Sequence, residues 1–312
     1  PSRCNGIVDP SRPVPIGHRH GASAGNRDMT DTSFDHQAVP LRIDRVRLKV
    51  RDLKPMSDFY QRVIGLAQID QAPGKVILAA GQRPLLELVE DANARHRNPR
   101  APGLFHLALL LPDRAALGRW LTHVLMLDVP LQGAADHIVS EAVYLTDPEG
   151  NGIEFYCDRP VAEWRDARGQ LQMATMPLDS SDLLSVAGTV WAGFPAAGAI
   201  GHVHLQVGDT DATDRFYRDV VGFELTSRLP GASFFGSGGY HHQLAGNTWN
   251  SRGAGPRPVD MAGLEAITIR VREPANCRDI LQRASQAGFM PATNDRNPVL
   301  QDPSGLQIEL TT

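Results

Sequence analysis

The chain has 312 residues, of which 42% are hydrophobic and 21% charged, and its formal net charge is −4 at pH 7. This composition is ordinary for folded domains, and the length suits about two domains with sizeable cores. The small negative charge offers no electrostatic footprint for nucleic acid or an anionic membrane, so we expect neither partner. No stretch approaches the roughly 20 apolar residues of a membrane span and no secretory signal is seen, so we expect a cytoplasmic protein. The sequence permits a homo-oligomer but does not indicate one.

Residues 1–40 differ in kind from the rest of the chain. They are rich in Pro, Gly, Ser, Arg and Asp, and their isolated apolar residues follow neither a helical nor a strand period. Such a segment cannot bury enough apolar surface to offset the entropy lost on ordering. We therefore predict a disordered or extended tail over residues 1–40.

The remaining sequence contains two copies of one pattern. A Phe-Tyr pair followed by a glycine occurs at Phe59-Tyr60 and again at Phe216-Tyr217. An Asp-Pro-x-Gly turn occurs at Asp147 and again at Asp302, at nearly the same offset from the Phe-Tyr pair. Solenoid repeats have periods of roughly 20 to 50 residues, so a repeat this long indicates a duplicated domain.

Periodicity within the first copy predicts the order β-α-β-β-β, and the strand at 104–111 starts the same order again. The predicted elements are a strand over 43–50, a helix capped by Asp52 and stopped by Gly65, strands over 67–70, 76–80 and 85–90, a strand over 104–111, a helix over 114–127, and strands over 142–146 and 152–156.

The second copy repeats this order. Its predicted elements are a strand over 202–207, a helix over 212–221, strands over 224–228, 233–235 and 241–248, a strand over 264–271, a helix over 276–287, and strands over 298–302 and 306–310. We therefore divide the chain into a first domain over 41–157, a linker over 158–199 that packs on the domains, and a second domain over 200–312.

Several of these segments resemble the vicinal oxygen chelate superfamily, which includes glyoxalase I, bleomycin-resistance proteins and extradiol dioxygenases. The resemblance is carried by the run from Ile200 to Leu205, by Gly103-Leu104-Phe105-His106, and by the endings Asp147 to Glu154 and Asp302 to Glu309. Residues 238–242 and 247–249 are similar to a bacterial two-module catechol 2,3-dioxygenase group. The resemblance implies an α+β fold of tandem βαβββ units, in which two domains each form an open, cup-shaped sheet covered by helices.

This resemblance also implies a metal site in the second domain. The expected ligands are His202 on the first strand of that domain, His241 on its fourth and Glu309 on its last. Strand alternation puts His241 on the face of Asn247 and Trp249, whereas His242 is the ligand if Leu244 lines the cup. Two imidazoles and one carboxylate suit Fe(II), and Mn(II), Zn(II) or Ni(II) accept similar ligands.

The histidine pattern departs from the extradiol dioxygenases in one respect. Those enzymes take their second histidine from the fifth strand, where the second copy has Ala266. The first copy does carry Glu87, His106 and Glu154 at ligand-like positions, but Arg45 stands where the second copy has His202. A fixed cation opposes metal binding and can pair with Glu87 or Glu154, so we expect the first domain to be structural.

The resemblance implies an Fe(II)-dependent extradiol dioxygenase that cleaves catechol or a related hydroquinone with O2. Proton transfers fall to His204, His242 and Tyr240, and Asn247 and Trp249 shape the aromatic pocket. Two alternatives stay open: a glyoxalase-like isomerase using Zn(II) or Ni(II), and a metal-free protein that binds an aromatic drug.

Overall fold

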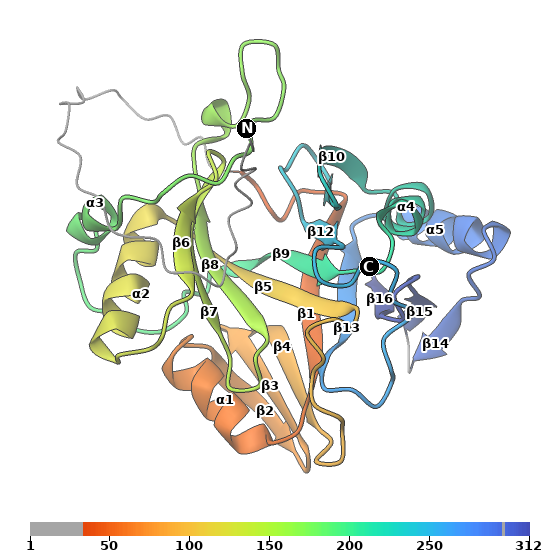
Figure 1. Cartoon of the computed structure of the whole chain (residues 1–312), viewed down its shortest axis with the longest axis horizontal. Coiled ribbons are helices and arrows are strands. Elements are labelled where there is room, and N and C mark those ends of the chain that lie inside the picture. Colours follow the sequence, from red (N-terminus) through yellow and green to blue (C-terminus); the bar gives the residue numbers. More distant parts are fainter. Residues whose placement is uncertain (1–33, 295–296) are drawn as a thin grey trace, which may run out of the picture.

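The computed structural model describes residues 34–294 and 297–312, which fold into two curved eight-stranded sheets with helices at their periphery (Figure 1). Four βαβββ units follow one another along the chain, and we call them units one to four. Among the described residues no helix is both long and apolar enough to span a membrane.

Units one and two come from the first sequence copy. Unit one contains β1 (Leu41–Val50), α1 (Leu53–Arg62), β2 (Ala67–Ala72), β3 (Lys75–Ala80) and β4 (Arg83–Glu90). Unit two contains β5 (Gly103–Leu111), α2 (Arg114–Met126), β6 (Gly133–Asp136), β7 (Ser140–Thr146) and β8 (Gly152–Asp158). The linker carries a 3-10 turn, η1 (Val161–Glu163), and a short helix, α3 (Ser180–Ser185).

Units three and four come from the second copy. Unit three contains β9 (Ala199–Gln206), α4 (Thr210–Asp214), the π-helical segment η2 (Arg215–Val221), β10 (Glu224–Leu229), β11 (Ala232–Gly236) and β12 (Leu244–Asn247). Unit four contains β13 (Gly263–Val271), α5 (Pro274–Gln286), β14 (Ala292–Asn294), β15 (Asn297–Gln301) and β16 (Gln307–Thr311). The sequence does not predict β6 and β14, because both are short edge strands without apolar alternation.

Each sheet combines one unit from each sequence copy. Sheet one has the order β14-β15-β16-β13-β1-β4-β3-β2 and joins units four and one. Sheet two has the order β10-β11-β12-β9-β5-β8-β7-β6 and joins units three and two. The expected fold class of tandem βαβββ units is confirmed, but neither copy closes a sheet by itself. The first strands of the four units have similar patterns, so the sequence does not reveal which pair will meet.

Two antiparallel pairs of first strands hold the sheets together. β1 pairs with β13 in sheet one, and β5 pairs with β9 in sheet two. In every unit the first strand also pairs in parallel with the fourth strand of its own unit, as β5 does with β8. β5 therefore lies between β8 and β9, which come from different sequence copies.

The repeated landmarks of the sequence meet in the folded chain. Tyr60 donates a hydrogen bond to Oδ2 of Asp147 at 3.0 Å, and Tyr217 donates one to Oδ2 of Asp302 at 2.9 Å. Each aspartate also accepts backbone N–H groups of its own turn. Burial raises the pKa of both carboxyl groups to about 6, although these hydrogen bonds act to lower it. The repeat thus encodes a buried tether between neighbouring units, made once in each copy.

The substitution Tyr217→Phe removes the donor that Asp302 meets in the folded state. The folded pKa of Asp302 lies above its ordinary value, so its ionisation already costs stability as the pH rises through about 6. Without the hydroxyl this cost grows, and we expect the free energy of unfolding to fall by about 1.5–3 kcal/mol near pH 8 and by less near pH 5. Urea denaturation at the two pH values measures this difference, and an equal loss at both would contradict the role of the tether.

The N-terminal segment from Phe34 to Pro40 is packed against the protein, so the expectation of a loose tail does not hold for these residues. The ring of Phe34 lies 5.6 Å from that of Trp164 and 4.9 Å from that of Tyr240. Trp164 belongs to the linker and is buried. The rest of the predicted tail, residues 1–33, lies outside the described residues.

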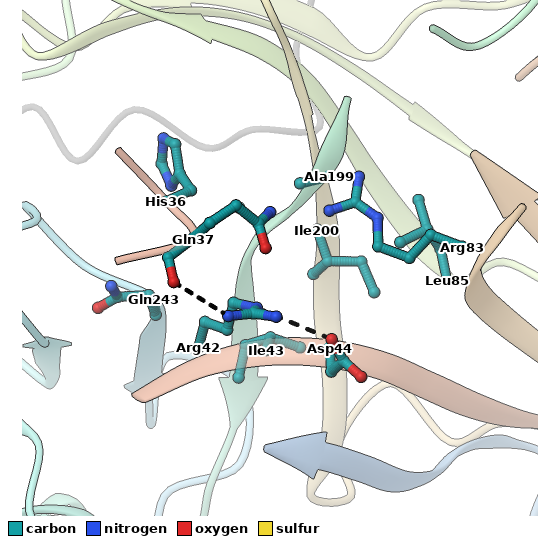
Figure 2. A pocket seen from close by; sticks show the side chains of 11 residues that line it. His36, Gln37, Arg42, Ile43, Asp44, Arg83, Leu85, Ala199, Ile200 and Gln243 are labelled. Carbon is teal, nitrogen blue, oxygen red and sulfur yellow. Dashed lines mark hydrogen bonds and ion pairs between the residues drawn. The ribbon is translucent and has the colours of Figure 1, made fainter. Parts of the chain in front are cut away.

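A small cavity of about 10 Å³ lies where this segment crosses β1 and β9 (Figure 2). Its floor is formed by Arg42, which donates to the carbonyl of Gln37 at 3.3 Å and pairs with Asp44 at 3.8 Å. A space of this size holds about one water molecule, so it is too small for a substrate. It marks a seam at which the N-terminal segment is fixed to both sheets.

Candidate metal centre

Three potential metal ligands converge on sheet two: His106 from β5, Glu154 from β8 and His202 from β9. Nε2 of His106 lies 3.2 Å from Nε2 of His202 and 3.0 Å from Oε2 of Glu154. Nε2 of His202 lies 3.3 Å from the same carboxylate oxygen. All three side chains are buried. Two imidazoles and one carboxylate therefore meet at one buried point of the sheet.

The sheet register explains this convergence. Ala108 on β5 lies opposite both Glu154 on β8 and His202 on β9. Adjacent strands are about 4.8 Å apart, and residues two apart on a strand share a face. His106 therefore points to the same side of the sheet as the two side chains that flank Ala108.

The electrostatics of the cluster suit metal binding. Burial raises the pKa of Glu154, but His202 and His106 outweigh this effect and hold the pKa well below its ordinary value. Burial lowers the pKa of His202 to about 4, against the attraction of Glu154. At neutral pH the site therefore offers an ionised carboxylate and a neutral imidazole, which are the protonation states that a metal ion requires.

Two imidazoles and one carboxylate that share one face, leaving other coordination positions open, match the donor set of non-haem Fe(II) oxygenases. The three donor atoms lie within 4.8 Å of one another. The residues present therefore fit a single first-row divalent ion.

His204 lies beside this cluster on the same strand as His202. Its ring is 4.8 Å from the ring of His106 and 5.7 Å from that of Trp249. Nδ2 of Asn247 donates to Nε2 of His204 at 3.0 Å, and burial holds the pKa of His204 well below its ordinary value. Asn247 is fully buried, so it orients His204, whereas Trp249 is 48% exposed and lies at the rim.

His242 flanks the cluster on another side. Its ring lies 4.3 Å from the ring of His202, and burial holds its pKa well below the ordinary value. The expected ligand His241 instead places Nε2 at 2.9 Å from Oδ1 of Asp158 and Nδ1 at 2.9 Å from Nδ1 of His242. The structure thus brings His242, and not His241, against His202.

The strand expected over residues 241–248 begins only at Leu244, which removes the basis for assigning these histidines by alternation. Gly238 and Gly239 have φ angles of +64° and +85°, which glycine adopts readily and which turn the chain between β11 and β12. His241 and His242 lie in this connection.

Tyr240, expected to transfer protons, is buried behind the cluster. Its hydroxyl lies 2.7 Å from that of Tyr156 and donates to Oδ1 of Asp158 at 3.1 Å. The ring of Tyr156 lies 5.1 Å from that of His202. A Cβ atom at Gly201 would come within 1.6 Å of the Tyr156 hydroxyl, so only glycine allows this tyrosine to cross β9.

Glu309, the third expected ligand, lies in sheet one and not in sheet two with His202. It occupies the position on β16 that Glu154 occupies on β8, and it faces Thr268 as Glu154 faces Ala108. Nη2 of Arg47 pairs with Glu309 at 2.9 Å, and Nη2 of Arg45 at 3.7 Å. This corrects the expected grouping of His202, His241 and Glu309, because the unit that carries Glu309 pairs with unit one.

Sheet one uses arginines where sheet two uses histidines. Arg45 and Arg47 pair with Glu87 at 3.8 and 3.3 Å, and Lys75 pairs with the same carboxylate at 2.5 Å. The expected pairing of Arg45 with Glu87 is therefore present. Fixed cations therefore compensate the charges of both buried carboxylates, Glu87 and Glu309.

His106 and Glu154 were predicted to belong to a structural site in the first copy. The signal that pointed to His106 was its place on a fifth strand, where extradiol dioxygenases carry a ligand. What the sequence could not supply was the pairing of β5 with β9, which brings both residues to His202.

Comparisons with known proteins agree with this fold. The family model described as "Glyoxalase/Bleomycin resistance protein/Dioxygenase superfamily" matches residues 42–155 and 199–310. The chain belongs to this superfamily. A curated relative, "Catechol-2,3-dioxygenase" from Bacillus subtilis (strain 168), is 37% identical over 273 residues, which are 85% of this chain and 95% of the relative.

Solved structures share the arrangement at lower identity. One of a putative dioxygenase from Bacillus subtilis subsp. subtilis str. 168 has a TM-score of 0.59 at 16% identity and covers 86% of this chain and 84% of its own. One of glyoxalase I from Zea mays has a TM-score of 0.55 at 14% identity, with 88% and 93% covered. At these identities the likeness establishes the fold alone.

The geometry predicts which carboxylate is needed for metal uptake. We expect Glu154→Gln to weaken Fe(II) binding by more than about 100-fold, because a direct ligand matters at least as much as its supporting residues. Glu309→Gln should keep full metal stoichiometry. Metal content per chain after anaerobic loading measures both variants, and loss of metal from Glu309→Gln alone would move the site to sheet one.

Proposed function

We propose that the protein is an Fe(II)-dependent extradiol dioxygenase that cleaves a catechol or a related hydroquinone at the cluster on sheet two. The observation that carries the proposal is the convergence of His106, His202 and Glu154 within hydrogen-bonding distance of one another. The 37% identity to a catechol-2,3-dioxygenase over most of both chains supports the same reaction.

Bound Fe(II) would supply open coordination positions and a redox change through which a catechol and O2 react. The carbon–carbon bond beside one hydroxyl breaks; one oxygen atom of O2 enters the new aldehyde, and the other joins the former hydroxyl oxygen in the new carboxylate. The electrons come from the ring, so the balance needs no external reductant.

The histidines that flank the cluster divide the proton chemistry between them. His242 is neutral and lies against His202, so it is placed to accept a proton from a catechol hydroxyl. His204 accepts a hydrogen bond from Asn247 through Nε2, so its Nδ1 carries the proton and can donate to a developing oxyanion. Tyr240 contacts Tyr156 and Asp158 and takes no direct part in proton transfer.

Aromatic side chains form the walls around these groups. Phe105 lies 5.0 Å from His204 and 5.5 Å from Trp249, and Phe234 lies 5.2 Å from His242, measured between ring centroids. Such rings favour stacked or edge-on contact with a planar substrate. Trp249 is half-exposed at the edge of this aromatic group, so its substitution should affect substrate binding more than metal binding.

A glyoxalase-like isomerase is less well supported. That reaction uses a glutamate to move the proton in addition to the carboxylate that holds the metal. The cluster contains one carboxylate, Glu154, and the nearby half-buried carboxylate of Asp158 is engaged by His241. A metal-free drug-binding protein gives no reason for two imidazoles to meet a buried carboxylate.

His202→Ala should abolish both iron content and ring cleavage, because it removes one of three ligands. Glu87→Gln, in sheet one, should retain most of the activity. Oxygen uptake with a panel of catechols, together with the absorbance of the yellow ring-fission product, measures both variants. Zn(II) or Ni(II) in the active form, or binding of an aromatic compound without turnover, would favour the alternatives.

A further inference from the structure

A series of hydrogen bonds connects the N-terminal segment with the candidate metal centre. Nε2 of His36 lies 3.2 Å from Oδ2 of Asp158, and Nε2 of His241 lies 2.9 Å from the other oxygen of this carboxylate. Nδ1 of His241 then meets Nδ1 of His242 at 2.9 Å, and the His242 ring packs against His202. This series of hydrogen bonds therefore ends beside His202 of the candidate metal centre.

The ionised state of the Asp158 carboxylate determines which atom donates in each of these hydrogen bonds. Burial raises the pKa of Asp158, but hydrogen bonds from His241 and His36 outweigh it and leave the pKa below its ordinary value. An ionised carboxylate only accepts hydrogen bonds, so Nε2 of His241 carries the proton. A neutral His241 then accepts through Nδ1, which requires His242 to donate through its own Nδ1.

The outcome for His242 is one defined tautomer. With its proton on Nδ1, a neutral His242 has a lone pair on Nε2, and this atom has no hydrogen-bond partner among the described residues. The alternative is an imidazolium at His241, which has no exposed surface. That cation would have to share the single charge of Asp158 with His36 and the Tyr240 hydroxyl. The neutral arrangement satisfies the same contacts without burying a second charge.

We propose that Asp158 is a positioning residue that acts through His241 to fix the tautomer of His242, so that His242 offers an unprotonated Nε2 beside His202. The role of that nitrogen as proton acceptor rests on the proposed function. The tautomer of His242 does not rest on the proposed function, because it follows from contacts within the protein.

Nitrogen-15 NMR of the full-length, zinc-loaded protein labelled at histidine reads the tautomers directly. Signals are assigned by their loss in His241→Gln and His242→Gln. We expect His241 to be protonated at Nε2 and His242 at Nδ1. An imidazolium at His241, or a proton on Nε2 of His242, would overturn the proposal even if no Asp158 variant folds.

Asp158→Asn tests the coupling with almost no change in volume. The amide can donate to Nε2 of His241, which reverses both bonds and leaves the proton of His242 on Nε2. We expect both tautomers to invert and kcat for ring cleavage to fall by about 100-fold or more, the range for loss of a general base. Iron content and KM should stay within about twofold of the wild-type values, because no ligand and no pocket residue changes.

Glu163→Gln is the matched control, since Glu163 is close in sequence and its exposed carboxylate pairs with Arg159 at 3.9 Å. It should change neither tautomers nor kcat. Unchanged tautomers in Asp158→Asn together with a wild-type kcat would overturn the positioning role. The predicted tautomers in a wild-type protein that cleaves no catechol would instead overturn the proposed function and leave the assignment for His242 intact.

Discussion

The antiparallel pairing of β5 with β9 is the constraint on which the site depends. It sets a strand of the first copy beside a strand of the second, and β8 completes the set from the other side of β5. His106, Glu154 and His202 are far apart in sequence and come from three neighbouring strands at nearly the same height. A shift of one residue in this register would turn His202 to the opposite face of the sheet.

The two sheets place a buried glutamate at the same position and satisfy it in different ways. In sheet one Glu309 meets Arg45 and Arg47, so its charge is compensated within the protein. In sheet two Glu154 meets the imidazoles of His106 and His202 and has no fixed cation beside it among the described residues, so a cation from outside is the natural complement. One backbone thus supports a closed ion-pair network in one sheet and a candidate metal centre in the other.

Much of the fold could be predicted from the sequence, because local periodicity indicates the order of strands and helices. The repeated Phe-Tyr and Asp-Pro-x-Gly landmarks indicate the duplication. The resemblance also identified His202 as a ligand candidate and His204 and His242 as its neighbours. The expected grouping of Glu309 with His202 does not occur in the structure, since it depended on which units share a sheet. Which units share a sheet depends on long-range pairing among four similar first strands, and the local sequence does not indicate this pairing. The structure places His241 against Asp158 and not against His202, because two glycines replace the expected strand with a turn.

The exchange of units between copies has a consequence for biosynthesis. β1 emerges from the ribosome among the first strands but waits for β13, the first strand of the last unit, before its free edge is covered. Contacts of such wide sequence separation form slowly and leave apolar edges open to aggregation in the interval. Neither sequence copy completes a sheet by itself, so each copy depends on the other to cover the open edges of its first strands.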